Sequence, residues 1–266
     1  MAVIAQRLSA PGCGPGYESS TLSNRPMKKP PGNGRLFLLR FFEKFCYTSV
    51  MLFPELDATR FALVNLNDEA KEWLKQRSVA EVNPLLNSTE CQTMINECHW
   101  RLGVDFSYGG WLEDRGDFLW GSYLDEGRRY IHLGVDFNVP AGTRVTVDRT
   151  CTVIRIDDDY PEEHGWGMRV IVQESQSNVI IIFGHLDRQV SVRIDEILEP
   201  GTMIGSVGIS PYNGGWFPHL HVQVIDANHY VELLNNDLRD LDGYGRIEDI
   251  DTLKSIFFDP MNYVSI

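Results

Sequence analysis

Apolar runs in the second half of the chain alternate with short polar segments. The runs are rich in Val, Ile and Thr, and Gly, Pro and Asn turn signals separate them. They span residues 145–156, 168–173, 179–183, 204–207 and 219–225. Short strands in this arrangement predict a mainly β fold, with an antiparallel sheet built as a sandwich or a barrel-like core. The run 179–183 has no polar position, which predicts a strand buried on both faces.

The pattern before residue 100 is helical. An N-cap signal at Asn67 is followed by charged first-turn residues. Further along the chain, apolar residues recur at helical spacing and form a stripe of Cys91, Met94, Ile95 and Cys98. We therefore expect residues 55–98 to be helical, with residues 51–100 as a small attachment to a main domain at 101–266.

The first 50 residues differ from the rest in composition. Residues 1–34 are rich in Gly, Pro and Ser, which predicts disorder, and residues 36–46 fit a short amphipathic helix. Two interpretations stay open for residues 1–50. They form a disordered basic tail, or translation starts at Met51 and they are not part of the protein.

Charge is distributed unevenly along the chain, whose formal net charge is -13. Residues 1–50 carry seven Lys/Arg against two Asp/Glu, whereas the remainder carries 17 against 35. An acidic surface repels phosphate groups, so we expect no nucleic-acid partner and no binding to anionic membranes.

Cysteine usage and hydropathy indicate the compartment. The five cysteines are odd in number and form no C-x-x-C pair, which argues against a disulfide framework and fits a reducing environment. The N-terminus lacks the apolar core of a signal peptide, and Arg40, Glu43 and Lys44 interrupt the apolar stretch at 36–53. We expect a cytoplasmic location and no transmembrane segment.

Histidine and aspartate residues in three of the β-like segments are the candidate chemistry. His132 and Asp136 stand four apart, His185 follows an apolar run, and His219 and His221 alternate on one strand face. Imidazole and carboxylate are the usual ligands of a catalytic zinc. On a straight strand His132 and Asp136 would lie about 13 Å apart, so sharing one metal requires a bend. Gly134 between them permits it.

Other candidates are weaker. His99, His164 and His229 are each interpreted as ordinary, partly buried histidines. Trp166 and Phe217 could line a groove for substrate, and packing in the core or at its rim is at least as good an interpretation. Asp187 and Gln223 could orient metal ligands, but a solvated turn residue and an outward strand residue are the favoured interpretations. Tyr212 and Trp216 lie in a Gly-rich loop before the H-x-H pair and are candidates for substrate contact.

The motifs together resemble a known enzyme family. H-x-x-x-D at 132–136, G-H-L at 184–186 and H-x-H at 219–221 are similar to the lysostaphin/LytM-type zinc endopeptidases, which cleave peptidoglycan on a duplicated-hybrid-motif β fold. The resemblance covers residues 130–225. A finer one, from Glu113-Asp114-Arg115 to His132, is to a variant fused between phosphotransferase and aminotransferase domains.

The resemblance implies roles for five residues. His132, Asp136 and His221 correspond to the zinc ligands, and His185 and His219 to the catalytic histidines. The implied reaction is hydrolysis of a peptide bond in a peptidoglycan stem or cross-bridge, which would allow a location in the cell envelope. Two alternatives remain: a zinc hydrolase of a small cytosolic amide or peptide, and a non-catalytic module that binds a peptide or glycan.

Overall fold

The computed structural model describes residues 50–79, 81–160, 164–235 and 243–266. The chain divides into two units, residues 1–45 and 46–266, and the described residues all belong to the second. The predicted disordered tail, apart from Val50, and the predicted helix at 36–46 lie outside the described residues.

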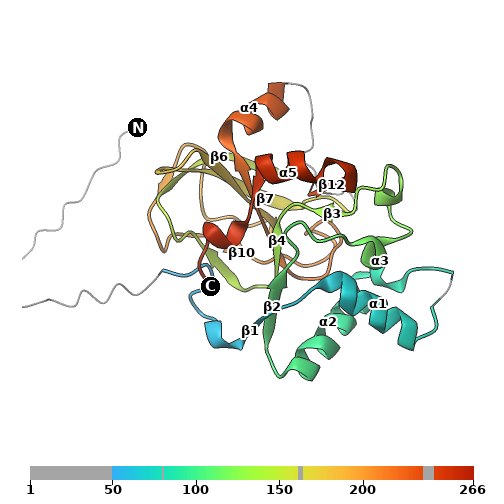
Figure 1. The fold of residues 1–266 in the computed structure, drawn as a ribbon. Coiled ribbons are helices and arrows are strands. Elements are labelled where there is room, and N and C mark those ends of the chain that lie inside the picture. Colours follow the sequence, from blue (N-terminus) through green and yellow to red (C-terminus); the bar gives the residue numbers. More distant parts are fainter. Residues whose placement is uncertain (1–49, 80, 161–163, 236–242) are drawn as a thin grey trace, which may run out of the picture. The chain divides into compact units, whose positions relative to one another are not determined.

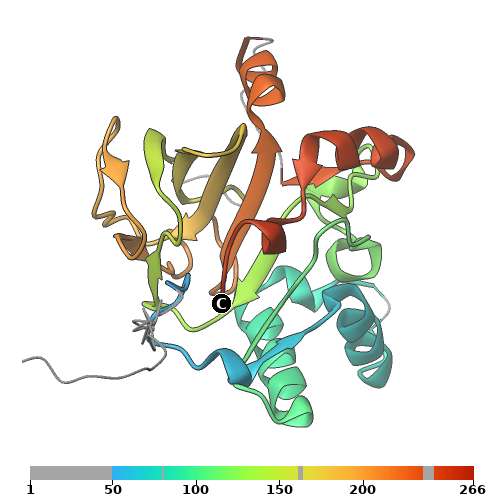
Figure 2. The same cartoon turned by 60° about the vertical axis from the view of Figure 1, so that its left-hand side comes forward.

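A large sheet dominates the described part of the chain (Figures 1 and 2). It has nine strands in those ranges, in the order β1-β2-β4-β11-β8-β7-β6-β9, with β13 also paired to β11. The strands are β1 (Phe61–Leu63), β2 (Phe106–Gly109), β4 (Val135–Asn138), β6 (Cys151–Asp158), β7 (Met168–Glu174), β8 (Val179–Leu186), β9 (Ile197–Leu198), β11 (Leu220–Asp226) and β13 (Phe257–Phe258). All pairings are antiparallel except β1 with β2, so the predicted mainly β, antiparallel fold is confirmed.

Two smaller sheets accompany it: β5 (Arg144–Thr146) with β10 (Met203–Ser206), and β3 (Ile131–His132) with β12 (Tyr244–Gly245). Val145 and Ile204 of the first pair belong to the same buried cluster as strand residues of the large sheet, which gives a layered, sandwich-like core. In the described residues the sheet is not closed into a barrel, because β1 and β9 end it without pairing to each other.

Strand β8 shows why the sheet is buried on both faces. All eight of its residues are buried, as the apolar run predicted. Alternate side chains point to opposite faces, so Ile181 and Phe183 join one hydrophobic cluster while Ile180 and Ile182 join another. The cluster that contains Ile180 and Ile182 also includes Tyr230 of α4 (Ala227–Asn235). Apolar residues of α5 (Ile250–Ile256) pack against it.

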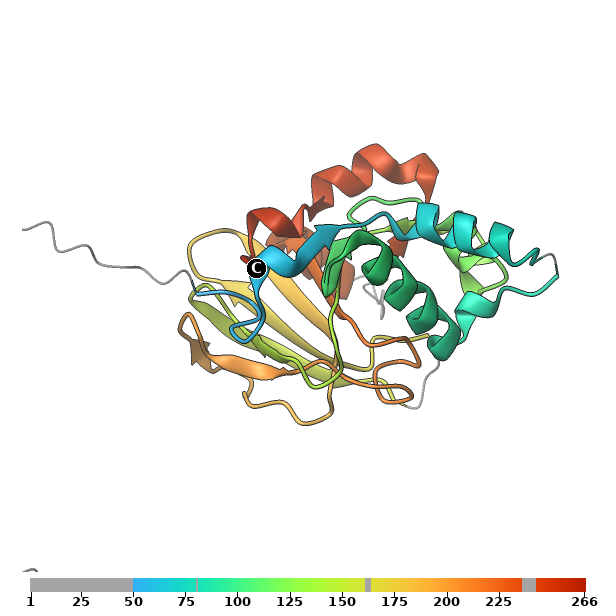
Figure 3. The same cartoon turned by 90° about the horizontal axis from the view of Figure 1, so that it is seen from below.

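The predicted helical attachment is present as α1 (Leu66–Gln76) and α2 (Ser88–Leu102), which lie together with α3 (Gly116–Leu119) in Figure 3. The stripe of Cys91, Met94, Ile95 and Cys98 is buried as expected. The cap of α1 is Asn65 rather than Asn67, since the Asn65 side chain accepts from the Asp68 amide at 2.8 Å. The Asn67 side chain instead accepts from the backbone amides that begin α3.

One part of the helical prediction is wrong. Residues Phe61–Leu63 form strand β1, which pairs in parallel with β2. The aromatic ring of Phe61 packs against Phe53 and Phe106, with centroids 6.0 and 4.9 Å apart. Leu52 is fully buried, and its amide donates to the Ser265 carbonyl. Residues 51–100 are thus built into the same compact unit as the sheet.

Short 3-10 helices complete the described ranges: η1 (Ala58–Arg60), η2 (Pro84–Leu86), η3 (Tyr123–Asp125), η4 (Ile247–Asp249) and η5 (Pro260–Asn262). Of the helices in those ranges, none combines the length and the apolar character that crossing a membrane requires.

Candidate metal centre

The order of strands in the large sheet brings the three motifs together. Asp136 on β4 and His221 on β11 are direct cross-strand partners, and His221 also faces Gly184 on β8. Directly opposed residues of an antiparallel pair project from the same face of the sheet. Motifs 85 residues apart in sequence therefore meet on one line across the sheet, with His185 following Gly184.

His132 lies close to these residues but belongs to a separate two-stranded sheet. The chain leaves β3 after His132 and enters the large sheet only at Val135, so the predicted bend around Gly134 is present. Strand β3 pairs with β12, and Tyr244 is the cross-strand partner of His132. The bend allows residues four apart in sequence to approach one point.

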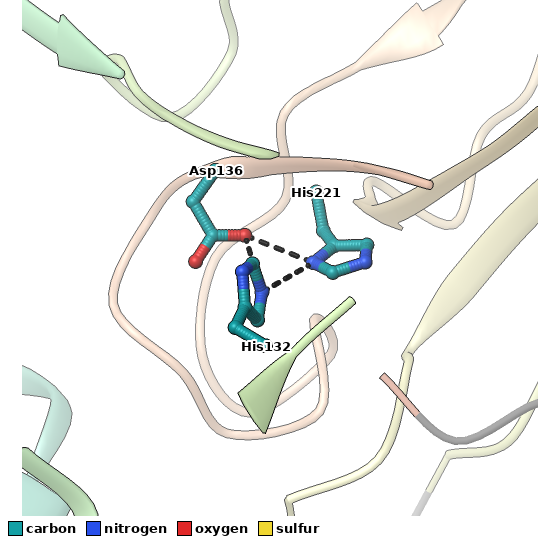
Figure 4. Close-up of side chains that lie close together, drawn as sticks. All are labelled: His132, Asp136 and His221. Atoms are coloured by element: carbon teal, nitrogen blue, oxygen red, sulfur yellow. Dashed lines mark hydrogen bonds and ion pairs between the residues drawn. The ribbon is translucent and has the colours of Figure 1, made fainter. Parts of the chain in front are cut away.

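Three donor atoms converge at that point (Figure 4). His132 Nε2 lies 3.0 Å from His221 Nδ1 and 3.4 Å from Asp136 Oδ1, and His221 Nδ1 lies 2.9 Å from the same oxygen. All three side chains are at most 4% exposed. Donors bound tetrahedrally to zinc stand about 3.3 Å apart, close to the spacing observed.

Hydrogen bonds on the outer nitrogens fix which donor atoms face the centre. His132 donates from Nδ1 to the Gly110 carbonyl at 3.0 Å, and His221 donates from Nε2 to Gln223 Oε1 at 3.2 Å. With the ring protons assigned this way, two imidazole lone pairs and a carboxylate oxygen face one another with no proton between them. Such a donor set fits a metal cation, as does outer hydrogen bonding of the ligands.

The electrostatic environment favours the same protonation state. Burial lowers the pKa of His132 to about 3. Although burial alone would raise the pKa of Asp136, His132 and Arg115 hold it well below its usual value. At neutral pH the centre thus combines a neutral imidazole with a charged carboxylate, the forms in which these groups bind metals.

His219 and His185 lie beside the three donors. His219 donates from Nδ1 to the Phe217 carbonyl at 2.8 Å, and its Nε2 lies 3.7 Å from Asp136 Oδ1. His185 donates from Nδ1 to the Asn213 carbonyl at 2.9 Å, and its ring centroid is 4.4 Å from that of His219. Burial lowers the pKa of both imidazoles. Each is therefore a neutral base whose Nε2 is free to accept a proton.

The backbone at His185 is strained. Its φ is +61°, a left-handed conformation that residues with a Cβ rarely adopt. Strain of this kind persists only where the surrounding structure enforces it, and it concentrates at functional sites.

One pocket contains all five residues of the motifs. Its walls are largely aromatic and polar, and consist of Arg115, Phe118, Tyr123, His132, Asp136, His164, Gly165, Trp166, His185, Trp216, Phe217, His219, His221, Gly243 and Tyr244. Trp216, a predicted substrate contact, is in this lining, and its Nε1 donates to the Gly165 carbonyl at 2.9 Å. Tyr212 lies outside it, with its ring 5.1 Å from that of Tyr160.

Two residues interpreted as ordinary belong to the site. His164 lines the pocket, between the rings of Tyr123 and Trp216. Gln223 is fully buried and not an outward strand residue, and its amide oxygen orients His221. The sequence could have indicated this contact, because Gln223 stands two residues after His221 and that spacing places both side chains on one face of a strand.

The other weak candidates behave as ordinary residues. The Asp187 carboxylate accepts from the Gln189 amide within its own turn. His99 is hydrogen-bonded to Ser107, and His229 to Asp226.

Arg115 contacts the candidate centre, and the sequence interpretation did not single it out. Its side chain is 1% exposed, and Nη1 donates to Asp136 Oδ2 at 2.6 Å. The same nitrogen lies 3.3 Å from the Tyr244 hydroxyl. Arg115 stands in a stretch that supported the finer resemblance, but nothing local in the sequence indicates which carboxylate a buried arginine meets.

Comparison with known proteins gives one family match. Residues 130–233 match the model of Peptidase family M23. The five motif residues lie inside this segment, whereas Arg115 and Tyr244 lie outside it. No curated protein matches the chain.

Several solved structures resemble parts of the chain. The antimicrobial peptidase lysostaphin from Staphylococcus simulans is 21% identical over 50% of this chain and 43% of its own, with a TM-score of 0.35. A mutant catalytic domain of the prophage-encoded M23 protein EnpA from Enterococcus faecalis is 21% identical over 36% and 68%, with a TM-score of 0.31. A zinc containing peptidase from Vibrio cholerae is 24% identical over 37% and 28%, with a TM-score of 0.30.

Proposed function

We propose that this chain is a zinc-dependent metallopeptidase that hydrolyses peptide bonds in the stem or cross-bridge peptides of peptidoglycan. The observation that carries the proposal is the convergence of His132 Nε2, Asp136 Oδ1 and His221 Nδ1, with both imidazole protons held on the outer nitrogens. The M23 match over residues 130–233 supports the same activity.

The three donors would hold the zinc ion, and two neutral imidazoles with one carboxylate would leave it a net positive charge. When bound, zinc supplies Lewis acidity, which polarises a carbonyl group and lowers the pKa of water. The chain itself contributes the orientation of the donors, through the Gly110 carbonyl and the Gln223 amide.

His219 and His185 are the proton carriers of the proposed reaction. As water adds to the scissile carbonyl, its proton passes to a free Nε2 of this pair. The same proton then moves to the amine as the C–N bond breaks. Both imidazoles are neutral in the resting site because burial lowers their pKa, so each has an unprotonated ring nitrogen for the role of general base.

Aromatic walls of the pocket supply the proposed contacts to the substrate. Trp216, His164 and Tyr123 follow one another away from His185, with successive ring centroids 6.3, 5.2 and 6.0 Å apart. Tyr212 would contact substrate further out. Peptidoglycan as the substrate class, a location in the cell envelope, and kinship with the fused variant depend on the motif resemblance and form the finer part of the proposal.

Digestion of purified sacculi tests the proposal. We expect one zinc per chain by elemental analysis, and release of peptidoglycan fragments whose masses identify a cut peptide bond. Asp136→Ala should abolish the release, while His229→Ala, which alters a histidine outside the pocket, should leave it unchanged. Zinc binding without cleavage of sacculi or peptides indicates a binding module. Cleavage of small soluble amides alone indicates the cytosolic hydrolase.

A further inference from the structure

A buried cation lies on the outer side of the metal-binding carboxylate. Arg115 is 1% exposed, and an arginine stays charged at any physiological pH. Burying a charge is costly unless it is paired and hydrogen-bonded. The Arg115 guanidinium meets two carboxylates, Asp136 at 2.6 Å and Glu113 at 3.4 Å. The ion pair with Asp136 therefore compensates much of the cost of burying the guanidinium. It joins one particular pair of atoms, Arg115 Nη1 and Asp136 Oδ2.

The Arg115 backbone is anchored by contacts that do not involve the three metal donors. The Arg115 amide donates to the Tyr130 carbonyl at 3.0 Å, and its carbonyl accepts from the amides of Phe118 and Leu119. The end of the side chain is packed against Gly110, where a Cβ atom would stand 2.3 Å from Nη2. Arg115 is thus placed to orient the Asp136 carboxylate through its contact with Oδ2.

The two oxygens of Asp136 have different partners. Oδ2 accepts from Arg115 Nη1, while Oδ1 lies 2.9 Å from His221 Nδ1 and 3.4 Å from His132 Nε2. We propose that Arg115 is a positioning residue, which occupies Oδ2 so that Asp136 presents only Oδ1 to the metal. This inference rests on the proposed function, because it takes the three donors to be the zinc ligands.

Tyr244 and Glu113 connect this arginine to the rest of the centre. The Tyr244 hydroxyl lies 3.3 Å from Arg115 Nη1, and Tyr244 is the cross-strand partner of His132. Glu113 accepts from the Asn67 amide at the start of α1. The helical part of the chain is thereby joined to the metal centre through one ion-paired network.

Neutralising the arginine is the direct test. In Arg115→Met the side chain keeps an unbranched apolar stem but loses the guanidinium and its donors, so Asp136 Oδ2 loses its partner. We expect zinc affinity, measured by competition with a chromophoric chelator, to fall by about 10- to 100-fold, the usual cost of removing a group that orients a ligand. The visible spectrum of the cobalt-substituted protein should change as well, because it reports ligand geometry and not activity.

Arg169→Met is the matched control. Arg169 is also buried, and its Nε donates to a carboxylate of Asp157 at 3.1 Å. Neither residue is a donor of the metal centre. This variant should lose stability without altering the zinc dissociation constant or the cobalt spectrum, which separates ligand positioning from the general loss of a buried ion pair.

Arg115→Lys tests the inference if Arg115→Met does not fold. Lysine keeps the charge but lacks the planar fork that pairs with a carboxylate, so folding should be retained while the cobalt spectrum changes. Folded Arg115 variants with wild-type zinc affinity and spectrum would refute the inference. A wild-type protein that binds no zinc would instead refute the proposed function. Wild-type zinc binding without peptidase activity would refute only the proposed function, since the zinc and cobalt measurements still decide the role of Arg115.

Discussion

Gly134 and His221 are in such close contact that any side chain at position 134 would force a neighbour to move. A Cβ atom on Gly134 would lie 2.5 Å from Nε2 of His221 and equally close to the Val222 carbonyl oxygen. The φ of Gly134 is not in the left-handed range. Glycine is therefore favoured here because it leaves space for the His221 ring, whereas the bend itself needs no left-handed backbone.

Gly134→Ala should displace the His221 ring, because the second close contact is backbone and cannot rotate away. We expect zinc affinity to fall and the free energy of unfolding to decrease by about 1–3 kcal/mol, as for overpacking of a core. Zinc titration and urea unfolding of the same sample measure both effects.

Gly205→Ala is the control for that substitution. Gly205 also lies in a strand, but a Cβ atom there would meet its nearest neighbour at 3.7 Å, an ordinary contact. A Gly134→Ala variant as stable and as zinc-bound as Gly205→Ala would contradict the close-contact argument.

His219 and His221 should respond differently to substitution, although they stand two residues apart. His221→Ala removes a donor, so zinc and the stability that it contributes should be lost. His219→Ala keeps all three donors, so zinc should stay near one per chain while turnover falls by about 10²-fold or more. Elemental analysis after gel filtration, with activity on the same samples, distinguishes them.

The remaining motif residues extend this test. His185→Ala should resemble His219→Ala, whereas His132→Ala and Asp136→Ala should resemble His221→Ala. If His219→Ala loses its metal and His221→Ala retains it, the assignment of roles is reversed.

Gln223→Leu should weaken zinc binding without exposing the site. The variant removes the amide oxygen that holds the proton of His221 on Nε2, so the unprotonated Nδ1 is no longer favoured. We expect a loss of about 10- to 100-fold in zinc affinity, measured by chelator competition. Equal affinity in Gln223→Leu and the wild type would show that Gln223 only fills space.

The metal-free protein should lose stability in mild acid. Burial lowers the pKa of His132 to about 3, and it also lowers the pKa of His185 and His219 from 6.5. Below pH 6.5 the unfolded chain binds protons that the folded chain excludes, so the free energy of unfolding falls from about pH 6.5 towards 3. Calorimetry in chelator between pH 8 and 4.5 should give a Tm that decreases only in the acid part; a constant Tm would be inconsistent with buried neutral imidazoles.

Truncation at two positions tests where the folded unit begins. A chain that starts at Met51 should keep fold, zinc and activity, because no described site residue precedes it. A chain that starts at Pro54 loses Leu52 and Phe53, which are 0% and 1% exposed, and should be destabilised by several kcal/mol, since a buried Leu or Phe contributes about 2–5. Equal Tm values for the two chains would show that these side chains do not anchor the core.

The sequence by itself indicated the strands of the core and five candidate site residues. The apolar run 179–183 predicted a strand buried on both faces, since period and composition are local properties that one segment records. Residue type and spacing singled out His132, Asp136, His185, His219 and His221, because zinc chemistry needs imidazole and carboxylate groups. The family resemblance then divided them into expected ligands and expected catalytic histidines. The bend between His132 and Asp136 was also expected, because a straight strand would hold the two residues too far apart to share a metal.

Only the tertiary structure decided what surrounds those donors. Phe61–Leu63 became a strand because aromatic partners at Phe53 and Phe106 outweighed the helical pattern of its neighbours. Arg115 joined the centre because its partners, Asp136 and Tyr244, are 21 and 129 residues away in sequence. Burial makes that ion pair strong, but burial is a property of the whole fold and leaves no local pattern in the chain.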